Sequence, residues 1–301
     1  MTDQAATAMG HTFHDYATRR ISYVLPTRNK AQFIGKALDM AKRLVGPDDE
    51  LIVVDGGSTD DTKEVVAGYG GLVDVFISEP DLGPSHASNK GMLMARGKYI
   101  KWLTDDDEFF PEAMEQAVDV LEAHPEIDVL LCGGTLEVRR KVIPVYVPPG
   151  TNYGLSPEDV FRYTGTGMGV LIRRSALSQI GLFDYSNVAS DGEFIARAIA
   201  NKATVRFCRI SMFHHPIYEH STIIAQRRAW EQDMHRIVQR YCSRWFYLKY
   251  LVKTSILRNR ILGTPVIAGR NIILTALARL GNERAQIKLH PQEPIWDGGI
   301  S

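Results

Sequence analysis

Short apolar runs alternate with amphipathic stretches over the first two thirds of the chain. Aliphatic and β-branched residues dominate four runs that we predict to be buried strands, at 21–25, 51–54, 73–77 and 99–103. After the first run, apolar residues recur three or four positions apart, which predicts a helix whose buried face carries Phe33, Ala37, Ala41 and Leu44. Strands that alternate with helices in this way predict an α/β fold with a doubly wound, mostly parallel sheet.

The pattern changes in the second half of this region. A further strand is predicted at 127–132, and alternation of apolar and basic residues at 136–147 predicts an antiparallel hairpin, so the sheet should be mixed. Helices are expected from Pro111, where the missing N–H of proline costs nothing. Two more helices are expected at the capping-box patterns Ser156–Asp159 and Ser190–Glu193.

Beyond residue 220 the chain becomes helical and basic. An apolar stripe at helical spacing is formed by Trp230, Met234, Ile237, Tyr241, Trp245 and Leu248. Residues 227–288 contain thirteen Lys and Arg against three Asp and Glu, so this part carries +10 and the remainder −10. We therefore predict a flexible tail (1–18), an α/β domain (19–225) and a basic helical extension (226–301).

No segment is expected to cross a membrane. The most apolar stretch, 261–280, is interrupted by Pro265, Arg270 and Asn271, whereas a span needs about 20 predominantly apolar residues. The N-terminus lacks the basic-then-apolar pattern of a secretion signal, and three widely spaced cysteines suit a reducing compartment. The expected location is therefore the cytoplasm.

Three adjacent carboxylates, Asp105 to Asp107, follow the predicted strand at 99–103. Open α/β sheets bind ligands at the carboxyl ends of their strands. Three neighbouring negative charges repel one another unless solvent or a cation relieves them. A solvated acidic turn is the ordinary alternative for such a triplet, but its place at a strand end favours a binding site.

Neighbouring strands also end in polar residues. The segment PTRN (26–29) follows the first strand, and DGGSTDDT (55–62) follows the second, where Ser58 or Thr59 is expected to cap the next helix. The first strand is not followed by G-x-G-x-x-G, which argues against a dehydrogenase.

Five motifs occur in a fixed order: VLPTRNK (24–30), LIVVDGGSTDDT (51–62), SEPDLGPSHASNKG (78–91), GKYIKWLTDDD (97–107) and IGLFDYSNVASDGEFIARA (180–198). With them the chain resembles a family 2 glycosyltransferase of the GT-A fold, a group of inverting enzymes that use nucleotide-diphosphate sugars. The resemblance covers about two thirds of the chain. It implies transfer of a sugar to a hydroxyl acceptor, in the assembly of a cell-surface glycan.

The resemblance also implies a donor site for a UDP-, dTDP- or GDP-linked sugar. Within it, Asp55 would accept a hydrogen bond from the imino N–H of the base, as an ionised carboxylate can. The residues expected to bind the nucleotide sugar are Pro26, Thr27, Arg28, Asn29, Asp55, Asp81, Asn89, Lys90, Asp105 and Asp106.

A divalent cation, Mn²⁺ or Mg²⁺, is expected at the acidic triplet, because it would offset the charge of the pyrophosphate leaving group. By resemblance Asp106 holds the metal. Asp107 and His220 complete the expected metal site, although Asp107 could equally serve in the outer coordination or at the start of the next helix. Three histidines, His214, His215 and His220, cluster in this part of the sequence. Of these, His220 best matches a loop of the family that closes on the diphosphate.

Asp191 is the expected catalytic base, because it begins a helix after the LFDYSNVAS loop, as the acceptor-activating acid of the family does. Glu193 is the rival, although a capping-box contact with Ser190 would explain it more simply. A helix-start acid without a catalytic role is the ordinary alternative for Asp191.

The partners follow from these assignments. The acceptor is expected to be a glycan or a lipid-linked glycan, and nucleic acid is not expected because the acidic half would repel it. The basic extension could cap the catalytic domain, form a homo-oligomer interface, or contact the inner membrane face peripherally. Two other functions remain open from the residues: a nucleotidyltransferase with a GT-A-like core, and a nucleotide-sugar-binding module without catalysis.

Overall fold

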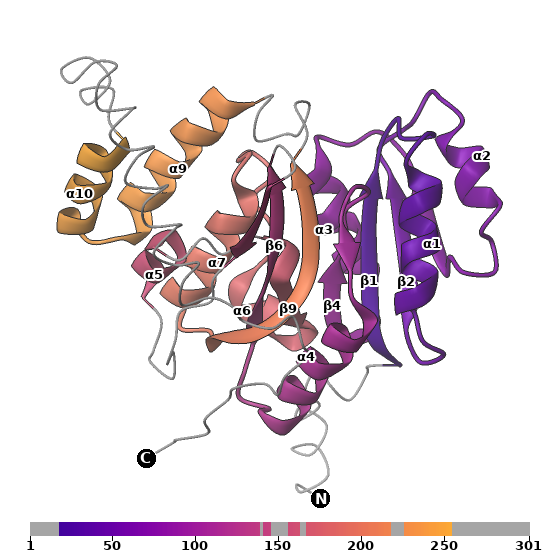
Figure 1. The fold of residues 1–301 in the computed structure, drawn as a ribbon, viewed down its shortest axis with the longest axis horizontal. Helices are drawn as coiled ribbons and strands as arrows, with labels where there is room; N and C mark the ends of the chain where they lie inside the picture. Colours follow the sequence, from indigo (N-terminus) through magenta and orange to yellow (C-terminus); the bar gives the residue numbers. More distant parts are fainter. Residues whose placement is uncertain (1–17, 139–140, 146–155, 163–166, 218–225, 255–301) are drawn as a thin grey trace, which may run out of the picture.

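The computed structural model describes residues 18–138, 141–145, 156–162, 167–217 and 226–254. These residues form one mixed sheet flanked by helices, with two further helices at one side (Figure 1). Residues 1–17 of the predicted tail, the apolar stretch 261–280 and His220 lie outside the described residues.

The strands are ordered β3-β2-β1-β4-β8-β6-β9-β5, with β7 paired to β6. Their bounds are β1 Arg19–Thr27, β2 Glu50–Asp55, β3 Val75–Ser78, β4 Gly97–Trp102, β5 Glu108–Phe109, β6 Val129–Val138, β7 Lys141–Val145, β8 Val170–Arg173 and β9 Val205–Ile217. Strands β1 to β4 are mutually parallel, whereas β8 is antiparallel to both β4 and β6. The predicted mixed, mostly parallel sheet and the hairpin of β6 with β7 are confirmed.

Helices cover both faces of the sheet. Their bounds are α1 Ile34–Leu44, α2 Thr62–Ala67, α3 Pro84–Met94, α4 Pro111–Ala123, α5 Pro157–Arg162, α6 Leu177–Ile180, α7 Ser190–Ala200, α9 Arg227–Tyr241 and α10 Arg244–Thr254. Side chains alternate along β1, so Tyr23 and Leu25 join the core with α1 and α4, while Val24 joins the core with α3 and α7. The apolar runs that lack polar alternation are therefore strands buried on both faces.

Because β1 to β4 are parallel, their carboxyl ends meet at one edge of the sheet. Thr27 pairs in register with Asp55, and Asp55 with Ser78. The acidic triplet follows β4 at the same edge. The predicted grouping of the polar strand ends is thus present.

Helix α9 packs against the α/β domain. Ile237 is 3% exposed and lies in one apolar cluster with Ala189 and Ala196 of the α7 region. The expected stripe does not continue into α10, because Trp245 is 75% exposed and Leu248 is 50% exposed. The cap interpretation is therefore favoured for α9, while the domain boundary at 225 stays a prediction.

Two local expectations were wrong. Phe33 precedes α1 and is 48% exposed, so the buried face of this helix is formed instead by Ile34, Ala37, Leu38, Met40, Ala41 and Leu44. The start of α2 has no side-chain cap, and Ser58 instead donates to Asp55. Ser58 is therefore bonded to the last residue of β2 and does not cap the helix.

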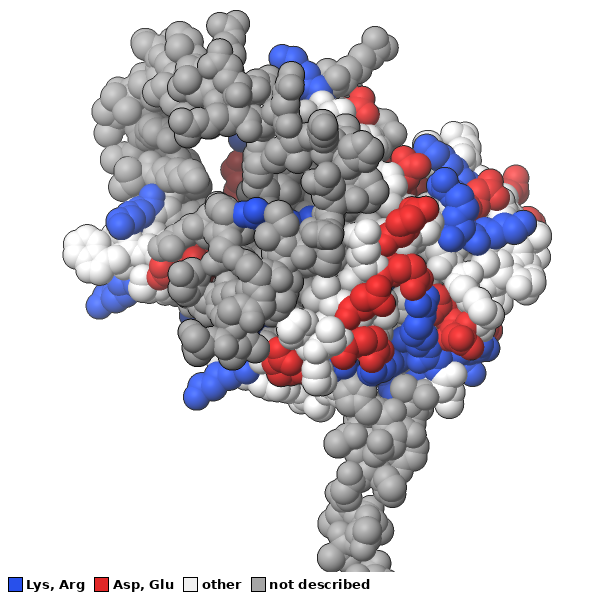
Figure 2. All heavy atoms as spheres, turned by 60° about the horizontal axis from the view of Figure 1, so that its bottom comes forward, with Lys and Arg blue, Asp and Glu red and all other residues white. Residues whose placement is uncertain are grey.

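No helix among the described residues is long and apolar enough to cross a membrane. Figure 2 shows the face at the bottom of Figure 1, where positive and negative side chains of the described residues are interspersed. Near the amino end of β1, Arg20 pairs with Glu115 at 2.6 Å and with Asp49 at 3.1 Å.

Candidate active site

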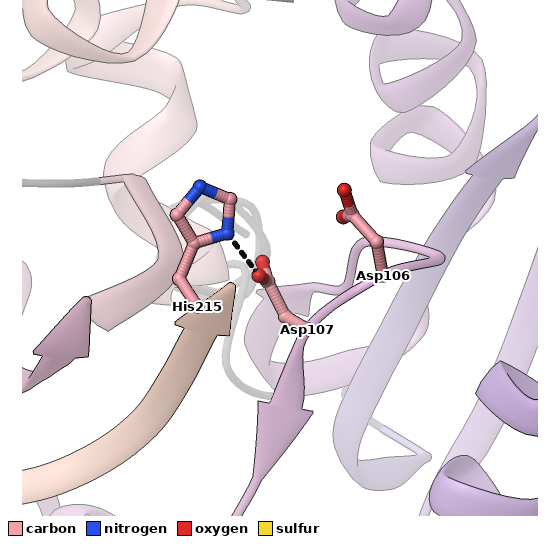
Figure 3. A group of neighbouring side chains, drawn as sticks. All are labelled: Asp106, Asp107 and His215. Carbon is pink, nitrogen blue, oxygen red and sulfur yellow. Dashed lines mark hydrogen bonds and ion pairs between the residues drawn. The ribbon is translucent and has the colours of Figure 1, made fainter. Parts of the chain in front are cut away.

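Two carboxylates and one imidazole meet beyond the end of β4. Asp106 and Asp107 lie between β4 and β5, and His215 lies near the end of β9. One ligand atom from each residue lies within 4.8 Å of the others (Figure 3). The Nδ1 atom of His215 contacts one oxygen of Asp107, and the hydroxyl of Thr104 donates to the other oxygen.

Strand pairing explains how His215 reaches this place. Strand β5 is antiparallel to β9, with Glu108 opposite His214, so the preceding Asp107 comes opposite His215. Strand β9 runs from Val205 to Ile217, so it extends far enough to include His215. His215 was part of the histidine cluster in the sequence, although His220 was preferred; only the extended strand distinguishes His215.

The electrostatics of the cluster favour a cation. Burial raises the pKa of Asp106, and the charges of Asp107 and Asp105 raise it further. Burial also raises the pKa of Asp105, against the effect of Lys30, whose Nζ lies 3.3 Å from it. Burial lowers the pKa of His215, but the hydrogen bond and charge of Asp107 outweigh this effect, so the net shift is upward. Carboxylates suit Mg²⁺ and Mn²⁺, and an imidazole suits transition metals, so these donors fit Mn²⁺ well.

Polar side chains lie at the ends of β1 and β2, at the same edge of the sheet as the acidic triplet. Asp55 is fully buried, and it accepts hydrogen bonds from Ser58 N–H at 3.0 Å and from the Ser78 hydroxyl at 2.6 Å. Thr27 is 5% exposed, and its hydroxyl has no hydrogen-bond partner among the residues that the structure describes. A buried hydroxyl without a partner is costly, so Thr27 is a candidate contact for a ligand.

The loop after β1 is tied to the loop after β2. Asn29 has a left-handed backbone (φ 51°), and its side-chain oxygen accepts a hydrogen bond from Thr59 N–H at 2.9 Å. Its own N–H donates to Ser58 Oγ at 2.8 Å. The neighbouring Arg28 is exposed and Pro26 is half-buried. Asn29 thus fixes the segment 26–29 against the loop that follows β2.

Three expected donor-site residues are engaged within the protein. Asn89 is 6% exposed, and its amide both accepts from and donates to the backbone of Phe183 at 2.9 Å. Lys90 pairs with Glu79 at 2.8 Å, and Asp81 accepts from Gly83 N–H at 2.9 Å. Asn89 therefore fixes the loop that leads to α7, and its role in donor binding stays a prediction.

Asp191 lies in the first turn of α7 with both carboxylate oxygens held by backbone groups. Gly167 N–H donates to one oxygen at 2.9 Å, and Gly192 N–H donates to the other at 2.8 Å. Burial raises the pKa of this carboxyl, against the effect of the two N–H donors. A carboxyl that is fixed in direction and less acidic than usual suits proton abstraction.

The turn that holds Asp191 is itself held by Lys101. The Nζ atom of Lys101, on β4, donates to the carbonyl of Met168 and, at 3.3 Å, to the carbonyl of Val170. Lys101 is fully buried, and this burial lowers its pKa to about 7. Strand β4 thereby connects the acidic triplet to the surroundings of Asp191.

Glu193 does not form the expected capping box. It is 4% exposed, pairs with Arg197 at 3.0 Å and accepts from the Tyr241 hydroxyl at 2.6 Å. Ser190 instead contacts the hydroxyl of Ser85 at 2.6 Å. Because Glu193 is paired with Arg197, Glu193 is less suited than Asp191 to act as a base.

Comparison with known proteins shows the family of the chain. The family model described as "Glycosyl transferase family 2" matches residues 22–181. The chain belongs to glycosyl transferase family 2. The match ends ten residues before Asp191, so it includes the ends of β1 and β2 and the acidic triplet but not α7 or α9.

Curated relatives of this family 2 chain include an uncharacterised glycosyltransferase of Rickettsia typhi, 29% identical over 172 residues, which are 55% of this chain and 54% of the relative. The chain thus spans about half the length of that relative.

Solved structures show the same GT-A fold. S. aureus TarS 1–349, solved with UDP-GlcNAc, has a TM-score of 0.59 at 20% identity, over 73% of this chain and 66% of that one. The mannosyltransferase PcManGT of Pyrobaculum calidifontis, solved with GDP-Man and Mn²⁺, has a TM-score of 0.57 at 19% identity, over 78% and 68%. The predicted family and fold are therefore confirmed, and a nucleotidyltransferase loses its support.

Proposed function

We propose that this family 2 chain is an inverting glycosyltransferase that moves a sugar from a nucleotide diphosphate to a hydroxyl acceptor, with Asp191 as the base. The observation that carries the proposal is the anchoring of both Asp191 oxygens by Gly167 and Gly192 at 2.9 and 2.8 Å. This contact aims the carboxylate in one direction without neutralising it by an ion pair. The cell-surface glycan remains the proposed product class, with a glycan or lipid-linked glycan as acceptor.

The reaction balances with one proton transfer. Asp191 takes the proton of the acceptor hydroxyl as that oxygen forms a bond to the anomeric carbon of the donor sugar. The bond from the anomeric carbon to the diphosphate breaks on the opposite face, and its electron pair leaves with the nucleoside diphosphate. A single displacement of this kind inverts the anomeric configuration.

The donor is proposed to lie across the ends of β1, β2 and β4. The unpartnered hydroxyl of Thr27 and the buried carboxylate of Asp55 offer polar contacts for the base of a UDP-, dTDP- or GDP-linked sugar. PcManGT and TarS were solved with GDP-Man and UDP-GlcNAc respectively, which supports a nucleotide sugar as ligand.

Asp106, Asp107 and His215 are proposed to hold Mn²⁺ or Mg²⁺, in place of the expected set with His220. The bound cation would offset the negative charge that develops on the diphosphate leaving group. The protein's own part is to orient the ligands, with Thr104 and His215 directing the carboxylate of Asp107.

Substitution of Asp191 by Asn tests the base assignment. Asn keeps the size and a hydrogen-bond acceptor but cannot take a proton at neutral pH, so transfer should fall by about 10²–10⁴-fold. Binding of UDP, dTDP or GDP with Mn²⁺, measured by calorimetry, should stay within a few-fold. Asp184→Asn, in the same loop, is the matched control, since the hydrogen bonds described for the Asp184 side chain go to the neighbouring Ser186 and Asn187. Transfer at the parental rate by Asp191→Asn would refute the assignment, and so would a product of retained configuration.

A further inference from the structure

Helix α9 contacts the chain on both sides of Asp191. On one side, a carboxylate oxygen of Asp233 accepts the N–H of Val188 at 2.6 Å, three residues before Asp191. On the other side, the hydroxyl of Tyr241 donates to Glu193 at 2.6 Å, two residues after Asp191. Asp233 is only 2% exposed and Glu193 only 4%, so both contacts are shielded from water.

The burial of these acids is the unusual feature. An acid that is almost fully buried is costly unless it is hydrogen-bonded and paired. For Asp233 this cost is offset by the hydrogen bond from Val188 N–H and by an ion pair with Arg236, whose side chain is 68% exposed. An ion pair at the surface of α9 would stabilise the helix equally well, so helix stability does not explain why Asp233 is buried. The hydrogen bond with Val188 N–H does explain it.

Other contacts fix the remainder of the same loop but come from the α/β domain itself. Arg197 donates to the carbonyl of Leu182 at 2.6 Å, and Asn89 holds the backbone of Phe183 at 2.9 Å. Beyond Phe183, the described hydrogen bonds of the loop to other elements are those of Val188 to Asp233 and of Ser190 to Ser85. Helix α9 therefore holds Val188, three residues before Asp191, while α3 holds Ser190.

Apolar packing keeps α9 in register with α7. Ile237, one turn beyond Asp233, lies in a cluster with Ala189 and Ala196, and Val238 is fully buried. Ala189 and Ala196 are small, so the two helices can approach closely. A shift of α9 along its axis would move both the Asp233 and the Tyr241 contacts at once.

We propose that Asp233 and Tyr241 are positioning residues for the sugar-transfer step: from α9, outside the segment matched by the family model, they fix the direction of Asp191. This inference rests on the proposed role of Asp191 as base. A displacement of a catalytic group by about 1 Å can cost on the order of 10²-fold in rate, so loss of either contact should reduce turnover without removing the donor site.

The experiment uses the full chain with Asp233→Ala, Asp233→Asn and Tyr241→Phe. The matched control is Glu231→Gln on the same helix, because Glu231 pairs with Arg227 at 2.8 Å and both side chains are at least half exposed. Transfer is measured with whichever UDP-, dTDP- or GDP-sugar supports turnover, and binding of the corresponding nucleoside diphosphate with Mn²⁺ by calorimetry. Amide hydrogen exchange at 186–192 reports the loop independently of activity.

We expect Asp233→Ala and Tyr241→Phe to lower kcat by about tenfold or more, with nucleotide binding within twofold and faster exchange at 186–192. Asp233→Asn retains an oxygen that can accept the Val188 N–H, so its kcat should return to within about threefold of the parent. Glu231→Gln should match the parent in all three measurements.

Two results would overturn the inference. The first is a parental kcat in both Asp233→Ala and Tyr241→Phe. The second is an equal loss of kcat in Asp233→Ala and Asp233→Asn, with no change in amide exchange at 186–192. The base assignment fails separately, if Asp191→Asn keeps its activity while Asp233→Ala still speeds exchange of the loop. A variant that does not fold would show as lost nucleotide binding, and Tyr241→Phe, which removes only one hydroxyl, then carries the test.

Discussion

Gly167 donates its backbone N–H to the Asp191 carboxylate at 2.9 Å, and no side chain fits between the two residues. A Cβ atom on Gly167 would lie 2.8 Å from the Cβ of Asp191 and 2.9 Å from its Oδ2. Both distances are shorter than real Cβ contacts, so either the turn at 167–169 or the first turn of α7 would have to move. The Asp191 carboxylate can therefore lie against residue 167, 24 positions away in the sequence, because that residue has no side chain.

Gly167→Ala is therefore predicted to impair transfer more than binding. The methyl group should displace the Asp191 carboxylate and reduce kcat by about 10- to 100-fold, while the proposed nucleotide site at the ends of β1 and β2 is unchanged. Gly192→Ala is the control, because Gly192 also donates to Asp191, but an added Cβ there would meet no described atom within 4 Å beyond its chain neighbours and the backbone of its own helix. Steady-state kinetics beside calorimetry of nucleotide binding measure the difference. Equal behaviour of the two variants would show that the close contact does not matter.

His215 and His214 give a matched test of the metal site. His215 contacts Asp107, whereas His214 contacts Thr135 at 2.8 Å and Glu137 at 3.3 Å. His215→Ala should therefore weaken Mn²⁺ binding by at least about tenfold, measured by electron paramagnetic resonance or calorimetry with and without UDP. His214→Ala should bind Mn²⁺ as the parent does. If His215→Ala retains parental affinity, the imidazole is not a ligand, and a metal site would rest on Asp106 and Asp107 alone.

Lys101 should make stability depend on pH in a defined direction. Its pKa is about 7 in the folded protein, because of burial, and about 10.4 for an ordinary lysine in the unfolded chain. Between these values the unfolded state binds more protons, so the free energy of unfolding rises with pH by up to about 1.4 kcal/mol per unit. Below pH 7 both states are protonated, and the cost of burying the charge is fully present.

Lys101→Met isolates this contribution. The unfolding free energy of the parent minus that of Lys101→Met should increase from pH 7 to pH 9.5, as measured by urea denaturation. Lys98→Met is the control on the same strand, since Lys98 pairs near the surface with Glu122. A difference that stays constant over this pH range would mean that Lys101 remains protonated in the folded protein.

Much of the architecture follows from local sequence. The runs at 21–25, 51–54 and 99–103 are apolar without alternation, which is typical of strands covered on both faces, and each became a strand of the parallel part of the sheet. Pro111 begins α4 as predicted. The five ordered motifs, together with these strands, were sufficient to indicate the GT-A fold.

Two of the local failures have a common cause. Ser58 has the chemistry of a helix cap, but the buried Asp55 beside it competes for its N–H and hydroxyl. Glu193 has the spacing of a capping box, but Arg197 and Tyr241 take its oxygens. In both places a buried charge required partners, and burial cannot be read from spacing along one segment.

The sequence by itself determined the order of strands and helices, the polar strand ends and the family, because these depend on periodicity and on short motifs. Only the tertiary structure decided that His215 faces Asp107, since this depends on the antiparallel pairing of β5 with a strand a hundred residues away. It also decided that Gly167, Asp233 and Tyr241 surround the Asp191 segment. Contacts of this kind are set by the packing of elements that are distant in the chain, and no local pattern specifies which residues will meet.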